Sequence, residues 1–251
     1  MAMKKRTKGN ITAPSLPGKD MLAEVNNNEA GNIYNSLFAK NRKVEYDNKD
    51  IALVNIRTNP DNQIFRAMDD DEDIRILAED IKRNGLMHNL VVFPEQEEGS
   101  AVYVLLSGER RFRALNYLQE KGDATWNIVN CNVVTTPLTE NEKKVLLYSA
   151  NLQVRGGFSD EAIRRQAIAE FITCLQREPY NMSREEALNA TKIVSTVNPR
   201  TIERDARIEE KLKGKLKTLL NDKFLTRSEC ETYLRFEADK QDEIANRFEK
   251  L

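Results

Sequence analysis

The sequence predicts an α+β protein, in which a compact α/β domain is followed by an all-α domain. Short apolar runs typical of strands alternate with helical periodicity in the first part of the chain, and only helical spacing follows Gly157. Charged residues make up 31% of the 251 residues and aromatic residues 7%, which favours a helix-rich protein with modest cores. The expected division is a tail at 1–48, an α/β domain at 49–156 and a helical domain at 157–251.

The expected tail begins with basic residues and continues through prolines and a polar run. Lys4, Lys5, Arg6 and Lys8 supply the positive charge. Few large apolar residues are present to offset the entropy of ordering, so the composition predicts disorder. A basic arm that touches DNA phosphates stays an alternative to a plain solvated tail.

The α/β part should contain four strands and several capped helices. The acidic run Asp69–Asp73 suits the N-terminus of a helix, and Gly85 stands where that helix should end. A capping box at Thr139 and Glu142 predicts a further helix over 140–152. The expected strands are Ile51–Ile56, one that follows a turn within Gly85–Phe93, Ala101–Leu106 and Ile128–Val134.

The stretch from Val104 to Leu115 is the most informative part of this domain. An apolar strand turns at Ser107-Gly108 and continues as a helix with arginines at 110, 111 and 113. The first N–H groups of such a helix and its dipole form an anion site. Cations at that end oppose the dipole, so the arginines indicate an anionic partner such as a nucleoside triphosphate.

Arg111 is the arginine whose direction matters most. At about 100° per residue it falls on the same side of the helix as Phe112, Leu115 and Leu118. A guanidinium on the core side needs a partner, because an unpaired buried charge is very costly. Glu109 or another acid in an ion pair is one candidate, and an anionic ligand is the other.

The composition argues against several kinds of site. With a net charge of −1 the chain has no overall positive charge that would attract nucleic acid, so any basic surface must be local. Cys131, Cys174 and Cys230 are scattered singly and His88 is the only histidine, which gives no metal-ligand spacing and no serine–histidine triad. No apolar run approaches the roughly 20 residues of a membrane span.

The all-α part should contain a helix-turn-helix. Ser159 is expected to cap its first helix, and Ser183 and Glu186 form a capping box. After a short turn, Asn198-Pro199 predicts the cap and first position of another helix. Thr226 and Glu229 open a last helical stretch that runs to Leu251.

The helix after Pro199 carries a narrow basic stripe of Arg200, Arg204, Arg207 and Lys211. A short turn followed by such a helix is the layout whose second helix enters the major groove of DNA. The alternative is a solvated face on which nearby acids neutralise the stripe. Those acids are Glu203, Asp205, Glu209 and Glu210, while Ile202, Ala206, Leu212 and Leu216 lie on the far side.

Ser-Gly-Glu-Arg-Arg-Phe-Arg-Ala at 107–114 resembles the phosphate motif Gly-Glu-Arg-Arg-x-Arg-Ala of the ParB partition proteins. The resemblance covers about residues 50–240. It implies a ParB/sulfiredoxin-like α/β domain that binds CTP, followed by a helix-turn-helix domain. Sulfiredoxin needs a cysteine in the phosphate turn, where this chain has Glu109. The nucleotide-binding residues implied are Gly85, His88, Ser107, Gly108, Glu109, Arg110, Arg111, Arg113, Asn151 and Arg155.

Two other boxes of the family are matched only in part. Ala150 replaces the glutamate of the family's Glu-Asn-Leu-Gln-Arg motif, which places hydrolysis of CTP in doubt. Gln63 and Arg66 are the counterparts of the catalytic first box, with the glutamine one residue out of register. The resemblance implies Mg²⁺ with the nucleotide, and Glu109 and Asn151 are the candidate ligands.

Arg200-Thr201-Ile202-Glu203-Arg204-Asp205 also looks like ParB-type recognition helices. The implied DNA-binding residues are Arg200, Thr201, Arg204, Arg207 and Lys211. The resemblance implies a homodimer in the cytoplasm, associated with the nucleoid, that serves plasmid, chromosome or mobile-element partition with a ParA-type ATPase. The separate C-terminal dimerisation domain of chromosomal relatives is expected to be absent or cut off. The competing function is a site-specific transcription regulator on the same scaffold, without CTP turnover.

Overall fold

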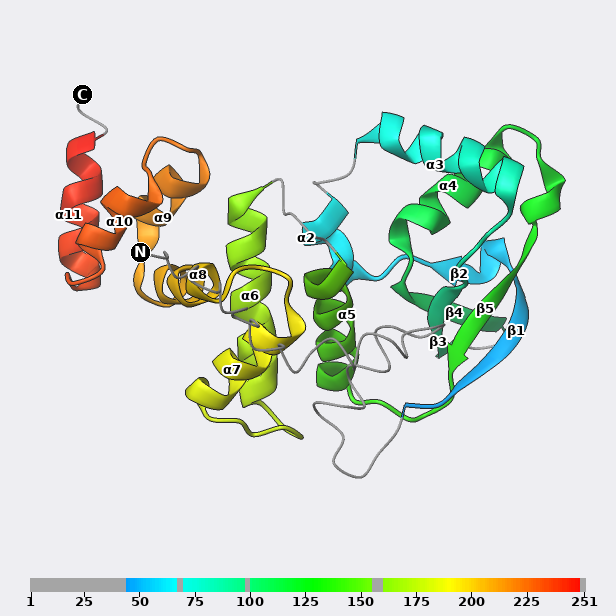
Figure 1. Cartoon of the computed structure of the whole chain (residues 1–251), viewed down its shortest axis with the longest axis horizontal. Coiled ribbons are helices and arrows are strands. Elements are labelled where there is room, and N and C mark those ends of the chain that lie inside the picture. The colour runs from blue at the N-terminus through cyan, green and yellow to red at the C-terminus, as the bar shows by residue number, and fades with distance from the viewer. Residues whose placement is uncertain (1–43, 67–69, 98–99, 155–159, 249–251) are drawn as a thin grey trace, which may run out of the picture.

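The computed structural model describes residues 44–66, 70–97, 100–154 and 160–248. Figure 1 shows a β-sheet at one end of an elongated molecule and a group of short helices at the other, with α5–α8 between them. The predicted α+β class, an α/β part followed by an all-α part, is confirmed. Nearly all of the expected tail lies outside the described residues.

The sheet has five strands in the order β1-β5-β3-β4-β2. β1 and β5 are antiparallel, as are β3 and β4, whereas β5 is parallel to β3 and β4 is parallel to β2. The order is mixed because crossovers bring strands far apart in sequence side by side. The strands are β1 Tyr46–Ala52, β2 Ile56–Arg57, β3 Leu90–Glu97, β4 Ser100–Ser107 and β5 Ile128–Val134.

The first strand begins earlier than the sequence predicts and ends sooner. The prediction started near Ile51 and ran to Ile56, whereas β1 starts at Tyr46, within the expected tail. From Asp47 to Asp50 its side chains are exposed, so no apolar pattern marks the strand, and backbone pairing with β5 defines it. A 3-10 turn at Leu53–Asn55 then separates β1 from β2.

Residues of β4 alternate between two cores on opposite faces of the sheet. Leu105 packs on the side of α3 and α4, while Val104 and Leu106 pack on the side of α5. This alternation is what a strand buried on both faces requires. The helices are α2 Gln63–Arg66, α3 Asp71–Asn84, α4 Glu109–Glu120 and α5 Glu140–Val154.

The acidic run caps α3, as predicted. The Asp70 side chain accepts a hydrogen bond from the backbone N–H of Glu72, and three acids occupy the first turn. Gly85 follows the last helical residue with φ of 80°, a left-handed value that glycine adopts without strain. The helix therefore ends where the sequence places its end, and the chain turns back towards β3.

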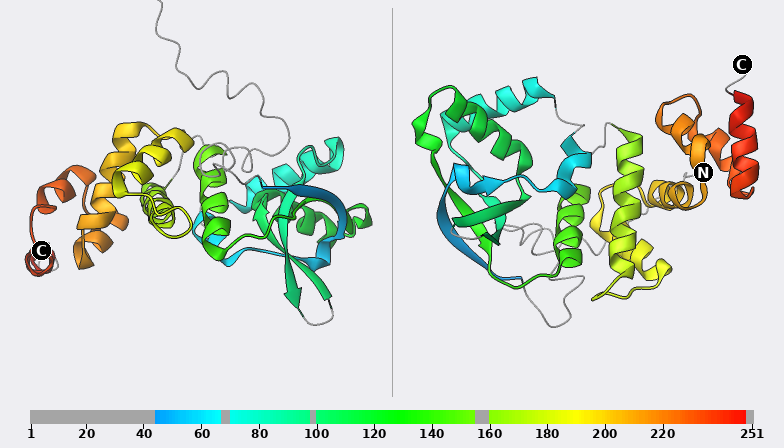
Figure 2. Two further views of the ribbon diagram at one scale, coloured as in Figure 1. Left: turned by 90° about the horizontal axis from the view of Figure 1, so that it is seen from below. Right: turned by 180° about the vertical axis from the view of Figure 1, so that it is seen from behind.

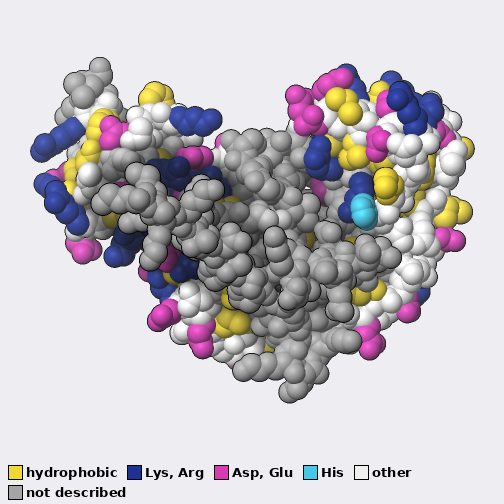
Figure 3. Space-filling model, viewed as in Figure 1, with side chains coloured by type: hydrophobic (Ala, Val, Ile, Leu, Met, Phe, Trp, Pro, Cys, Tyr) yellow, Lys and Arg dark blue, Asp and Glu magenta, His cyan; other side chains and the backbone are white. Residues whose placement is uncertain are grey.

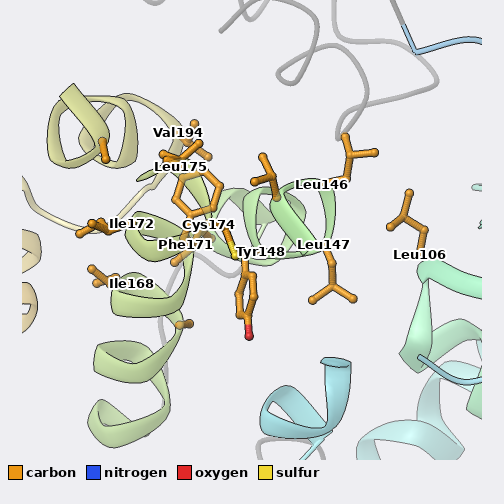
Figure 4. Close-up of a cluster of buried hydrophobic side chains, with 14 of the residues drawn as sticks. Leu106, Leu146, Leu147, Tyr148, Ile168, Phe171, Ile172, Cys174, Leu175 and Val194 are labelled. Atoms are coloured by element: carbon orange, nitrogen blue, oxygen red, sulfur yellow. The ribbon is translucent and has the colours of Figure 1, made fainter. Parts of the chain in front are cut away.

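The α5 side of the sheet shares its core with the first helices of the all-α part. Leu147 and Tyr148 of α5 meet Phe171 and Leu175 of α6 in one cluster of buried side chains (Figure 4). The predicted boundary at 156 and the Ser159 cap lie outside the described residues. Asp160 is the observed cap of α6, and its side chain accepts from the N–H groups of Ala162 and Ile163.

The predicted caps of the later helices are confirmed. Ser183 and Thr226 each form a capping box with the glutamate three residues on, and Asn198 accepts from the N–H of Arg200 with Pro199 next to it. The helices are α6 Glu161–Gln176, α7 Arg184–Val194, α8 Pro199–Lys211, α9 Gly214–Asn221, α10 Arg227–Tyr233 and α11 Ala238–Phe248.

The last three helices form a small unit with its own core, which also includes Ile208 and Leu212 from the end of α8 and its cap. Figure 2 shows this unit beyond α8 in both views. The buried Gln241 side chain accepts from the N–H of Lys213 and donates to the carbonyl of Lys211, so it fixes the junction of α8 and α9. None of the helices in the described ranges combines the length and hydropathy of a membrane span.

Candidate functional site

The predicted phosphate turn has the geometry that its sequence demands. Gly108 is the N-cap of α4 and has φ of 103°, a left-handed conformation that other residues rarely adopt. A Cβ atom at this position would lie 2.8 Å from Cδ2 of Leu90 and 3.2 Å from Nη2 of Arg111. The backbone conformation therefore favours glycine, and any other residue would also have to displace the ends of the Leu90 and Arg111 side chains.

Arg111 links this turn to the segment between α3 and β3. Its Nη1 donates to the backbone carbonyls of His88 and Asn89, the latter at 2.8 Å. The guanidinium thus meets carbonyl oxygens at the end of a turn, a kind of partner that the sequence did not suggest. The segment from Gly85 to Asn89 is thereby held beside the start of α4.

Asn89 fixes the other side of the same segment. Its Nδ2 donates to the side-chain oxygen of Asn130 at 2.7 Å and to that of Asn132 at 3.4 Å, both on β5. Asn130 in turn donates to Asp50 of β1 at 2.9 Å. The amide of Asn89 therefore ties the turn to the sheet. His88 beside it is exposed.

The remaining candidate residues at and before the start of α4 differ in their partners and exposure. Arg113 forms an ion pair of 3.0 Å with Asp71 at the start of α3. Arg110 is exposed, Ser107 is half-buried, and Glu109 is buried. Arg110 is thus the most exposed of the three arginines of α4.

The two partly matched motifs, one with Gln63 and the other with Ala150 and Asn151, lie together at α5. Nδ2 of Asn151 faces the Oδ1 of Asn62 at 3.4 Å and donates to the carbonyl of Leu147 at 2.9 Å. Lys144 of α5 pairs with Asp61 at 3.1 Å. Gln63, the predicted catalytic glutamine, begins α2 and is exposed. Arg155 and the side chain of Arg66 lie outside the described residues.

The candidate ligands Glu109 and Asn151 cannot form a complete Mg²⁺ site by themselves. No group of three or more histidine, cysteine, aspartate or glutamate side chains gathers within the described ranges. Ala150 is buried beside Asn151 and offers no ligand atom. Mg²⁺ usually keeps several waters and binds one or two carboxylates together with substrate phosphates. Of the two candidates, only Glu109 is a carboxylate, so the residues present supply little to hold the ion.

A second polar site lies on α8, at the opposite side of α5 and α6 from the sheet. A cavity of about 540 Å³ is bordered by α7, α8 and α10. Figure 3 shows lysine and arginine side chains gathered at this end of the molecule and, separately, over α3 and α4. The lining residues are Arg184, Leu188, Arg200, Glu203, Arg204, Arg207 and Glu231.

Three of the predicted DNA-binding residues, Arg200, Arg204 and Arg207, therefore border one cavity. Thr201 is half-buried and Lys211 is exposed at the end of the helix, and neither borders it. The far side of α8 is buried as predicted, with Ile202 fully inaccessible to solvent. The stripe is thus exposed on one face of a helix whose other face is fixed by the core.

Three of the four acids expected to neutralise the stripe, Asp205, Glu209 and Glu210, form their ion pairs with residues outside it. Asp205 is fully buried and accepts from Nε of Arg164 at 2.7 Å, because it faces α6 rather than solvent. Glu203 is bonded first to Lys192, and the nearby Arg200 and Arg207 of the stripe also help to lower the pKa of its carboxyl. Glu209 pairs with Arg165 and Lys217, and Glu210 with Arg184.

The acid that does meet the stripe is Glu231 of α10. Its Oε2 accepts from Arg204 at 2.6 Å and its Oε1 from Arg207 at 2.7 Å. Sequence reasoning missed it, because 24 residues separate Arg207 from Glu231 and no local pattern marks the contact. Arg184 was missed too, although a basic residue next to the Ser183 cap is a signal that could have found it.

The cysteines carry no chemistry at either site. Burial raises the pKa of Cys131 to about 12, and burial also raises the pKa of Cys174 and of Cys230 to about 11. All three side chains are buried, so they stay protonated and inaccessible near neutral pH. Thiol-based peroxide repair therefore has no candidate nucleophile here.

Comparison with known proteins finds similarity to ParB proteins. The family model of the ParB N-terminal domain matches residues 37–142. The chain is similar to C-terminally truncated chromosome-partitioning protein ParB from Caulobacter crescentus complexed with CTP-gamma-S, at 19% identity over 80% of this chain and 98% of that one, with a TM-score of 0.34. No curated protein matches.

Two more solved structures are similar over most of their length. The same Caulobacter crescentus protein complexed to the centromeric parS site has 15% identity, covers 79% of this chain and 89% of that one, and has a TM-score of 0.30. A Pnob8-like ParB-N domain has 11% identity, covers 82% and 98%, and has a TM-score of 0.47.

Proposed function

We propose that the chain, whose residues 37–142 match the family model of the ParB N-terminal domain, is a ParB-type partition protein that binds a specific DNA site and CTP as a clamp-type switch. The two activities reside in the two parts of the chain. The phosphate turn before α4 takes the nucleotide, and α8 takes the DNA.

The observation that carries the nucleotide assignment is the left-handed Gly108 at the start of the arginine helix. A helix N-terminus directs its first N–H groups outward, and a glycine turn lets a phosphate approach the backbone closely. Arg111 holds the segment with Gly85 and His88 beside this turn. Base and phosphates of one nucleotide can then meet both segments. Ser107, Glu109, Arg110, Arg113, Asn151 and Arg155 complete the proposed set.

DNA binding rests on the basic stripe of α8. Arg200 and Thr201 at the start of the helix would face base edges, and Arg207 and Lys211 would favour phosphates. The proposed assembly is a homodimer in the cytoplasm, associated with the nucleoid, and a ParA-type ATPase is its proposed partner. Plasmid, chromosome and mobile-element partition all fit this activity. Mg²⁺ would enter with the nucleotide's phosphates.

A transcription regulator on the same scaffold is the second candidate, and Ala150 favours it. This side chain is buried where the ParB motif carries a glutamate. A regulator would occupy its operator as a fixed complex, without needing nucleotide to stay bound. A clamp would instead load at the site and spread along the flanking DNA.

The two candidates differ in how protein accumulates on DNA. We expect CTP to raise the amount of protein retained on a DNA fragment whose two ends are blocked, and not on a fragment with one free end. The operator should first be selected from random DNA with the full chain. Retention limited to the operator and independent of CTP would support the regulator and contradict the clamp.

Hydrolysis of CTP should be slow or absent although CTP binds. Phosphoryl transfer needs a metal and a water placed against the γ-phosphate, and a carboxylate orients that metal. Alanine cannot do this, and Gln63 is out of register. Phosphate release, measured with CTP, magnesium and operator DNA, should therefore stay at the background rate.

The matching variants are Gln63→Ala and, as a control, Gln166→Ala on the exposed face of α6. Both should release phosphate at the same low rate as the unchanged protein. DNA-stimulated turnover that Gln63→Ala alone removes would contradict this interpretation of Ala150. Glu109 and the acids of the Asp69–Asp73 run would then be the candidates for the missing carboxylate.

A further inference from the structure

Glu231 of α10 engages two members of the basic stripe at once. One carboxylate accepts from Arg204 at 2.6 Å and from Arg207 at 2.7 Å. Ser228, one turn earlier on the same face of α10, accepts from the same nitrogen of Arg204 at 3.1 Å. The pairing is therefore a built contact between α8 and α10 and not a chance approach of two surface side chains.

The two arginines keep the Glu231 carboxyl group ionised. Burial by itself would raise the pKa of the carboxyl, but the hydrogen bonds from Arg204 and Arg207 outweigh burial and hold the pKa below its usual range. The carboxylate stays ionised at neutral pH and offsets one of two positive charges. The three side chains remain accessible, at 31% for Arg204, 53% for Arg207 and 26% for Glu231.

The position of this ion pair matters because it lines the same cavity as Arg200 and Arg184. A phosphate that reaches the cavity competes with Glu231 for the arginines, since both offer anionic oxygens to the same donors. Only DNA that gives Arg204 and Arg207 better partners than Glu231 can draw them away. A carboxylate next to the stripe also repels the phosphates of badly fitting DNA.

From this geometry we propose that Glu231 is a specificity-determining residue, which holds Arg204 and Arg207 back from the phosphates of non-cognate DNA and releases them to the correct site. The proposal rests on the proposed function, because it assumes that α8 binds DNA. Glu231 lies outside the proposed helix-turn-helix, yet it would set how strongly binding depends on the DNA sequence.

Glu231→Gln should tighten binding to random DNA by about tenfold at low salt. It should steepen the slope of log affinity against log salt by roughly one to two, because each phosphate newly neutralised adds about 0.9. Affinity for the selected operator should change less, so the ratio of specific to random binding falls. Fluorescence anisotropy with both DNAs over a salt series measures these quantities.

The control is Glu243→Gln on α11, which makes the same change of charge at a residue paired with Lys240. It should leave the random-DNA affinity and its salt slope almost unchanged. Thermal unfolding of both variants shows that they are folded. The α10 capping box depends on Glu229 and not on Glu231, so the fold has no reason to fail.

Arg207→Ala gives a second, independent readout. In the unchanged protein it should weaken random-DNA binding little, since Glu231 already occupies the arginine. In the Glu231→Gln background the same replacement should weaken it several-fold. Equal effects in the two backgrounds, or weaker random-DNA binding by Glu231→Gln, would overturn the proposal.

The failure of the inference is distinguishable from that of the proposed function. If the unchanged protein selects an operator but Glu231→Gln keeps its random-DNA affinity and salt slope, only the role of Glu231 is contradicted. If neither protein binds any DNA, the DNA-binding assignment of α8 fails as well.

Discussion

Arg111→Ala should lower the affinity for CTP by about a hundredfold, because hydrogen bonds to charged groups contribute roughly 1.5–3 kcal/mol and the variant also loses the link to the neighbouring turn. Arg111 donates to the carbonyls of His88 and Asn89 in the structure. Its removal takes a cation from the phosphate turn and frees the segment proposed to lie against the base. Isothermal titration with CTP and magnesium measures the change.

A lysine at the same position separates the two roles. Arg111→Lys keeps the positive charge but lacks the planar fork that reaches two carbonyls, so its affinity should fall between those of the alanine variant and the unchanged protein. Arg83→Ala, at an exposed position in the last turn of α3, is the control and should bind CTP normally. DNA binding should persist in all three variants. Unchanged CTP affinity in Arg111→Ala would remove the phosphate assignment.

The basic stripe should divide into residues that read bases and residues that hold phosphates. Lys211→Ala should weaken binding to all DNA about equally and lower the salt slope by about one. Arg200→Ala should cost ~1–3 kcal/mol at its own base pair and relax specificity there. Both follow from position, since Arg200 lies in the first turn of α8 and Lys211 in its last.

These effects are measured by titrating the operator and a set of single base-pair variants at several salt concentrations. Lys240→Ala, an exposed lysine on α11, is the control for a general loss of charge and should change little. If Arg204→Ala and Lys211→Ala both leave operator binding untouched, α8 is not the helix that reads DNA.

Local signals carried most of what the sequence predicted correctly. Gly108 is readable because a strand, a small-residue turn and a helix follow one another within a few residues. The caps at Ser183, Asn198 and Thr226 are readable because each bond spans two or three residues. The buried side of α8 follows from helical spacing alone.

Contacts between distant segments were not readable. The start of β1 escaped prediction because its exposed side chains leave no pattern, and its register comes from β5. The acids of α8 were assigned to the stripe from their spacing, yet Asp205 turns to Arg164 across a helix interface. Glu231 reaches Arg204 and Arg207 only because α10 folds back on α8, which no local signal encodes.

The central claim is that the phosphate turn and α8 belong to one switch, so CTP and DNA must influence each other's binding. Thermodynamic linkage requires the coupling to be reciprocal. The decisive measurement is a titration of the full chain with each of the four nucleoside triphosphates, with and without the selected operator. The account predicts that CTP binds, that the other three bind far more weakly, and that operator DNA changes CTP affinity. Equal binding of all four, or CTP affinity identical with and without DNA, would contradict it.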